Sequence, residues 1–133
     1  MTRILFVCVG NSARSQMAEA YCRTLGRDVE CASAGSQPAP NVQHNAVAVM
    51  AEDGIDISKA RPKGLAAVLP GKWDYVVSMG CEMDCPFVPG AKVVRWDIPD
   101  PRGRPLAEYR RAREIIRAEV ENLLSRLAEA SVP

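Results

Sequence analysis

The first 25 residues contain the pattern that most restricts the fold of this chain: a short apolar run, a few small and polar residues, and then a helical pattern. Residues 3–9 (RILFVCV) have the composition of a buried strand, and GNSARS follows at once. Apolar residues then recur at helical spacing over residues 15–25, and Gly26 follows as a helix stop. A buried strand that leads directly into a helix indicates the first unit of an α/β fold.

The rest of the chain repeats this alternation. Besides residues 3–9 and 15–25, we expect strands at residues 29–34, 73–79 and 92–96, helices at residues 42–52 and 106–128, and a short helix at residues 64–69. Strands that alternate with helices form a parallel sheet with right-handed crossovers. The sequence therefore predicts a single α/β domain over residues 1–133, a small doubly wound four-stranded parallel sheet with helices on both faces. Ligands in such folds bind beyond the carboxyl ends of the strands.

Charge and hydropathy limit the partners of the chain. The 17 basic and 16 acidic residues give a formal charge of +1, so no global field attracts nucleic acid or a membrane surface. The longest N-terminal apolar run, residues 4–9, is too short for a signal-peptide core or a membrane span. We therefore expect a cytoplasmic protein with no nucleic-acid or membrane partner.

Five cysteines are spread along the chain, an odd number that does not suit a disulfide framework in a reducing compartment. Cys22 and Cys31 fall in a predicted helix and a predicted strand, where we expect packing thiols. Cys81 and Cys85 form one C-x3-C pair, but His44 is the only histidine, so we expect no metal site.

The segment CVGNSARS places Cys8 at the end of the first strand and Arg14 near the start of the helix. Small residues let the intervening backbone curl so that its N–H groups point inward, and the helix N-terminus adds positive potential. The guanidinium of Arg14 can bind two oxygens in a forked contact. These features predict a loop that binds a tetrahedral oxyanion, formed by Val9, Gly10, Asn11, Ser12, Ala13 and Arg14.

The same surroundings would hold Cys8 as a thiolate aimed at the centre of the bound anion. Ser15 can donate a hydrogen bond to that thiolate, and Asn11 can hold the loop in shape because asparagine tolerates left-handed backbone. The alternative is a buried packing cysteine with Arg14 on the helix surface. The order of strand, C-x5-R-S motif and helix favours the nucleophile.

These residues resemble the low-molecular-weight tyrosine phosphatase fold family and, within it, the arsenate reductases. The matching segments are VCVGNSARSQMAEAY, CASAG, DGIDIS and WDYVVSMGCEMDCPFVPGAKVVRWDIPDP, which extend over most of the chain in the family's order. SQMAE at residues 15–19 is the reductase-like form, since the phosphatases usually carry proline after the serine. The phosphatases also often place tyrosines after the Asp-Pro pair, where this chain has Arg102 and Gly103.

The resemblance implies thiol-dependent reduction of arsenate to arsenite. Asp100, in the pair Asp100-Pro101, matches the family's general acid, which would protonate the departing oxygen; Asp97 is a competitor three residues earlier. The resemblance also implies that Cys81 attacks Cys8 and that Cys85 then attacks Cys81. Thioredoxin would reduce the resulting disulfide, with no bound cofactor.

Three alternatives to this cascade remain open from the sequence. An external thiol such as mycothiol or glutathione, with a redoxin, could replace the late cysteines. A low-molecular-weight tyrosine phosphatase would use the same Cys8, Arg14 and Asp100 through a phosphocysteine that water hydrolyses. A non-enzymatic oxyanion sensor is the third.

Some relatives bind potassium near the anion loop through an asparagine, a glutamate, a serine and an aspartate. The first three match Asn11, Glu19 and Ser33, whereas Lys63 falls at the aspartate's position. We expect the Lys63 ammonium to replace the cation and neutralise Glu19. The alternative is a solvated loop lysine.

Overall fold

The computed structural model describes residues 1–80 and 88–130. Its strands are β1 (Thr2–Cys8), β2 (Val29–Gly35), β3 (Tyr75–Ser78) and β4 (Lys92–Arg95), and its helices are α1 (Arg14–Leu25), α2 (His44–Glu52), the 3-10 helix η1 (Leu65–Ala67) and α3 (Leu106–Ala130). Every element that the sequence predicts is present, and its ends lie within two residues of the expected ones.

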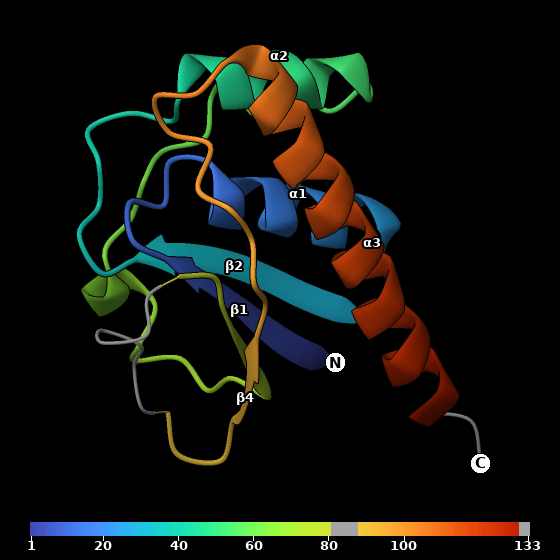
Figure 1. Ribbon diagram of the computed structural model, residues 1–133. Helices are drawn as coiled ribbons and strands as arrows, with labels where there is room; N and C mark the ends of the chain where they lie inside the picture. Colours follow the sequence, from blue (N-terminus) through green and yellow to red (C-terminus); the bar gives the residue numbers. More distant parts are fainter. Residues whose placement is uncertain (81–87, 131–133) are drawn as a thin grey trace.

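The four strands form one parallel sheet in the order β2-β1-β3-β4, which confirms the predicted fold class (Figure 1). β1 has a neighbour on each side, and its residues from Ile4 to Cys8 are all buried. Cys8 pairs with Gly35 of β2, and Val7 pairs with Ser78 of β3. The carboxyl ends of these three strands therefore meet at one edge of the sheet, where Cys8 lies.

The two faces of the sheet carry different layers. Ile4 and Phe6 of β1 belong to the larger core cluster, which includes residues of α1, α2 and α3. Leu5 and Val7, which alternate with them, pack on the other face in a smaller cluster that includes Leu65 of η1. Helices thus lie on both faces, but in the described part of the chain the second face has only the short 3-10 helix.

Ion pairs join α2 to α3 above the larger core. Arg110 bonds both carboxylate oxygens of Glu52, and Arg113 bonds one of them and also the Val49 carbonyl. These hydrogen bonds lower the pKa of Glu52 from its ordinary 4.5 to about 2. Within residues 1–80 and 88–130, no helix is both long and apolar enough to cross a membrane.

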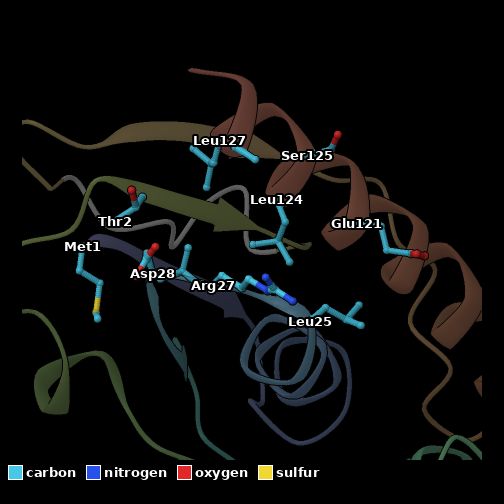
Figure 2. Close-up of a pocket in the computed structure, with 11 residues that line it drawn as sticks. Met1, Thr2, Leu25, Arg27, Asp28, Glu121, Leu124, Ser125 and Leu127 are labelled. Atoms are coloured by element: carbon cyan, nitrogen blue, oxygen red, sulfur yellow. The ribbon is translucent and has the colours of Figure 1, made fainter. Parts of the chain in front are cut away.

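A cavity of about 670 Å³ lies between the start of β1, the end of α1 and the end of α3 (Figure 2). Met1, Leu25 and Leu124 contribute to its lining, together with Arg27 and Asp28. These residues lie at the amino ends of the strands, opposite the edge that holds Cys8. Since ligands of parallel α/β sheets bind at the carboxyl ends, the functional site lies elsewhere.

Candidate active site

The loop after β1 surrounds the Cys8 sulfur with polar groups. Cys8 Sγ lies 2.8 Å from Ser15 Oγ, and the Asn11 N–H donates to the sulfur at 3.3 Å. Asn11 adopts φ 50°, the left-handed conformation that asparagine tolerates, and this turns its N–H inward. Cys8 is a free thiol and is 2% exposed. The sulfur is therefore held at the start of α1 by hydrogen bonds rather than surrounded by aliphatic groups alone.

Arg14 begins α1 and lies beside the same loop. Arg14 is 7% exposed, and its guanidinium donates to the Ile98 carbonyl at 3.3 Å. Arg14 Nη2 also lies 3.6 Å from Asp100 Oδ2, whose carboxylate accepts the Arg102 N–H at 3.1 Å. Gly80, directly after β3, has φ +83°, and a Cβ added there would lie 2.4 Å from Arg14 Nη1. The guanidinium is thus confined by backbone on two sides.

A cavity of about 100 Å³ lies between these groups. Its lining consists of Cys8, Val9, Gly10, Ser12, Ala13, Arg14, Gln43, Asp100 and Arg102. Its volume is well below the roughly 300–1,000 Å³ of sites for drug-sized ligands, and it suits a small tetrahedral anion. Asp100 lines the cavity, whereas Asp97 does not. The structure therefore brings Asp100, and not Asp97, to the sulfur and the guanidinium.

Beneath the loop, the Asn11 side chain connects four residues of the site. Its amide nitrogen donates to Ser15 Oγ at 2.8 Å and to Ser33 Oγ of β2 at 2.9 Å. Its amide oxygen accepts the Lys63 N–H at 2.8 Å and the Gln16 amide at 3.1 Å. Because Asn11 donates to Ser15, the Ser15 proton is left to donate to the Cys8 sulfur. Asn11 thereby orients the hydroxyl that faces this sulfur.

Glu19 extends this network away from the loop. Ser33 Oγ donates to Glu19 Oε1 at 2.7 Å, and Lys63 Nζ lies 3.8 Å from the same oxygen. Arg23 pairs with the other carboxylate oxygen at 2.9 Å. Two cations, the Lys63 ammonium and the Arg23 guanidinium, therefore flank a carboxylate that is mostly buried.

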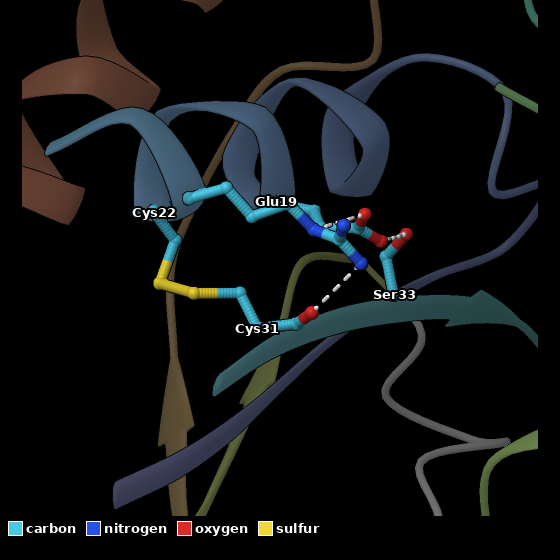
Figure 3. The surroundings of a disulfide bond; sticks show 5 residues. Glu19, Cys22, Cys31 and Ser33 are labelled. Carbon is cyan, nitrogen blue, oxygen red and sulfur yellow. Dashed lines mark hydrogen bonds and ion pairs between the residues drawn. A yellow bond between two sulfur atoms is a disulfide. The ribbon is translucent and has the colours of Figure 1, made fainter. Parts of the chain in front are cut away.

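Cys22 and Cys31 correct one expectation from the sequence. They were expected to be packing thiols, but the structure joins them in a disulfide between α1 and β2 (Figure 3). Their Cα atoms are 6.2 Å apart, within the range a disulfide spans, and both residues are buried. The sequence feature that could have indicated this bond is the alternation of side chains along β2, because Cys31 and Ser33 lie on the same face of the strand and that face meets α1. The Cys31 carbonyl accepts a hydrogen bond from Arg23, which pairs with Glu19.

Cys81 and Cys85 lie outside the described residues. Gly80, which precedes Cys81 in the sequence, lies against Arg14 at the same sheet edge as Cys8. In residues 1–80 and 88–130, no three side chains of histidine, cysteine, aspartate or glutamate gather in a group that could hold a metal ion.

Several polar residues that the sequence did not single out contact the site. They are Gln16, Arg23, Gln43, Arg102 and Tyr109. Gln43 precedes α2 as its cap residue and Tyr109 lies in α3, and the approach of these helices to the loop depends on long-range packing that no local motif records. A place for Gln16 beside the loop could have been predicted from the sequence, because it directly follows Ser15 in the first turn of α1.

The fold and this geometry define a class: an α/β protein in which a strand-end cysteine, an arginine and a carboxylate line one small cavity. The chain belongs to the low molecular weight phosphotyrosine protein phosphatase family, whose sequence pattern matches residues 3–132.

Several individual relatives are named as arsenate reductases. A glutaredoxin arsenate reductase of Synechocystis sp. is 33% identical over 131 residues, which cover 96% of this chain and all of the relative. The structure of an arsenate reductase in the phosphate binding state has a TM-score of 0.84 at 34% identity and covers 95% of this chain and 98% of that one. A thioredoxin-dependent arsenate reductase of Corynebacterium glutamicum has a TM-score of 0.80 at 31% identity, with 98% of this chain and 63% of that one covered.

Proposed function

We propose that this chain is an arsenate reductase in which Cys8 is the nucleophile. The observation that carries the proposal is the position of the Cys8 sulfur, 2.8 Å from the Ser15 hydroxyl, in the lining of a cavity that Arg14 and Asp100 share. A sulfur held by donors beside a guanidinium is suited to attack a bound oxyanion, and it would be poorly placed for a packing role alone.

In the first step, the loop amides and Arg14 bind arsenate and the Cys8 thiolate forms a bond to arsenic. Asp100, which lines the cavity, protonates the hydroxyl group of the bound monohydrogen arsenate, which leaves as water as the sulfur–arsenic bond forms. Its side chain is 51% exposed, so solvent can reprotonate it. Ser15 stabilises the thiolate before attack through the hydroxyl that Asn11 orients.

In the second step, another thiolate forms an S–S bond with Cys8 as the sulfur–arsenic bond breaks. The electron pair of that bond stays on arsenic, which is reduced from As(V) to As(III) and leaves as arsenite, while two thiols become one disulfide. We assign the attack to Cys81 and the next exchange to Cys85, which would free Cys8. Support comes from Cys81 following Gly80, which contacts Arg14.

A redoxin then reduces the disulfide. Thioredoxin is the donor that we propose, because one structural relative is described as thioredoxin-dependent; another relative is named for glutaredoxin. Since each turnover consumes thiols, we place the reaction in a reducing compartment, the cytoplasm.

Arsenate-dependent oxidation of NADPH by thioredoxin and thioredoxin reductase tests this proposal. We expect turnover by the wild type, none by Cys8→Ser, and a strong loss in Cys81→Ser and Cys85→Ser. The matched control is Cys22→Ser with Cys31→Ser, which removes two other cysteines and should leave turnover in place. Full activity of Cys81→Ser with thioredoxin would overturn the assignment of the attacking thiol. If mycothiol or glutathione with a redoxin restores that variant, an external thiol takes its place.

The second candidate is a phosphatase, because the family is defined by phosphotyrosine phosphatases and the site binds phosphate and arsenate alike. It would form a phosphocysteine on Cys8 that water hydrolyses. Efficient aryl phosphate hydrolysis by the variant that lacks both Cys81 and Cys85, with no arsenate reduction by the wild type, would favour it. Anion binding without either turnover would indicate a sensor.

We also propose that Lys63 supplies the positive charge that a cation provides in some relatives. Support comes from its ammonium 3.8 Å from Glu19 and from its N–H bond to Asn11, which ties the charge to the anion loop. Reductase rates in potassium and sodium chloride at equal ionic strength should agree. A selective rise with potassium would contradict this role.

A further inference from the structure

Ser12, in the loop after β1, has a buried hydroxyl group whose proton is available to a ligand. The residue is 4% exposed and lines the small cavity. Its oxygen accepts a hydrogen bond from Gln43 Nε2 at 2.9 Å. Among residues 1–80 and 88–130, no protein atom accepts the Ser12 proton. A buried hydroxyl proton at the wall of an anion cavity is a donor that the protein leaves to a ligand.

The direction of the Gln43 bond is set by a third residue, Tyr109 of α3. Its hydroxyl contacts Gln43 Oε1, and because a carbonyl oxygen cannot donate, the tyrosine proton lies between them. This fixes the amide of Gln43 with its nitrogen toward Ser12. Burial, and next the Asp100 carboxylate, raise the pKa of Tyr109, so the phenol keeps its proton in neutral solution.

Gln43 is also tied to the loop through its backbone. It is the cap residue of α2, and its N–H donates to the Ser12 carbonyl at 2.8 Å. Gln43 therefore links the loop both to the start of α2 and, through Tyr109, to the first turn of α3.

We propose that Ser12 donates a hydrogen bond to the bound oxyanion and that Gln43 and Tyr109 are positioning residues that aim its proton into the cavity. The ligand class is a small tetrahedral oxyanion with an unprotonated oxygen, such as arsenate or phosphate. The inference rests on the proposed function for the identity of that cavity as the substrate site.

Calorimetric binding of inorganic phosphate to the reduced full-length chain tests the inference without any turnover. Ser12→Ala should raise the Kd about tenfold or more, the usual range for loss of a bond to a charged group. Tyr109→Phe should raise it about threefold, because the amide of Gln43 is then free to turn. Tyr21→Phe is the matched control: that hydroxyl contacts Asp53, away from the cavity, and its loss should leave phosphate affinity unchanged.

The decisive measurement combines the two changes. If Tyr109 acts through the Ser12 proton, Tyr109→Phe will not weaken phosphate binding further in the Ser12→Ala background. An equal loss in both backgrounds would show that Tyr109 supports the loop in general and would overturn the relay. Unchanged affinity in Ser12→Ala would overturn the inference as a whole. A chain that shows this coupling but does not reduce arsenate would instead refute the proposed function and leave the inference in place.

Discussion

Gly80→Ala tests whether the position of Arg14 controls the site. An added Cβ would lie 2.4 Å from Arg14 Nη1, and ordinary contact begins near 3.4 Å, so the guanidinium must move by about 1 Å. The side chain is the part that yields, because it is the far end of a flexible residue and not backbone. A 1 Å misplacement of a binding group can cost about 100-fold in rate. We therefore expect kcat/KM for arsenate to fall by about that factor.

The backbone strain of this substitution needs its own control. Gly80 has φ +83°, where an L-residue costs about 1–2 kcal/mol. Gly54 has φ +75° with no atom within 4 Å of an added Cβ, so Gly54→Ala carries similar strain without a collision. Urea unfolding should show similar losses of stability in the two variants.

The assay for this comparison is phosphate binding together with arsenate-dependent NADPH oxidation. Phosphate binding does not require Cys81, so it separates displacement of Arg14 from any effect on the neighbouring cysteine. We expect weakened binding only in Gly80→Ala. If Gly80→Ala and Gly54→Ala bind phosphate and reduce arsenate within about threefold of each other, the reasoning about Arg14 is refuted.

Three further predictions concern stability and acid catalysis. Glu52 has a lowered pKa of about 2, so its stabilising contribution is present above about pH 4.5 and is lost as the pH falls toward 2. Glu52→Gln should therefore lower the urea midpoint of unfolding at pH 7 but not at pH 2. An equal lowering of the midpoint at both pH values would contradict this. Cys22→Ala removes a disulfide with a sequence separation of 9, which should lower the free energy of unfolding in urea by about 2.5 kcal/mol when no reductant is present. If the variant is destabilised by the same amount in excess reductant, the disulfide is not the cause. Asp100→Asn should lower kcat for arsenate reduction by about 100-fold or more, measured by NADPH oxidation, and a wild-type kcat would remove Asp100 as the general acid.

The fold was predictable because its signals are local. Each buried strand is a short apolar run, each helix has one apolar side, and the alternation of the two leaves a parallel sheet as the outcome. The element ends were less certain, since caps such as Gln43 carry no distinctive side-chain bond at the helix start. Even so, the ends differ from prediction by no more than two residues.

The sequence indicates which candidate-site residues lie together only where they are close in the chain. Cys8, Arg14 and Ser15 share one motif, and the structure places Cys8 and Arg14 in the lining of one small cavity, with the Ser15 hydroxyl against the Cys8 sulfur. Gln43 and Tyr109 reach the loop only through packing of α2 and α3, so no spacing reveals them.

The Cys22–Cys31 disulfide was not predicted from the sequence. Disulfides are rare in proteins of reducing compartments, and that general frequency argued against one here, although it says nothing about whether two particular cysteines lie close enough to bond. Cys22 and Cys31 face each other because one side of α1 packs on one side of β2. Combining the two predicted elements would have placed both sulfurs at the same interface.

The most direct test of the account is a single turnover by the fully reduced chain with excess arsenate and no electron donor. If Cys8 attacks arsenate and a second thiol releases the product, each chain yields one arsenite, and mass spectrometry finds Cys8 or its partners in one new disulfide. Cys8→Ser should yield no arsenite, and the variant without Cys22 and Cys31 should yield the full amount. Absence of arsenite from the wild type, or an undiminished yield from Cys8→Ser, would contradict the account.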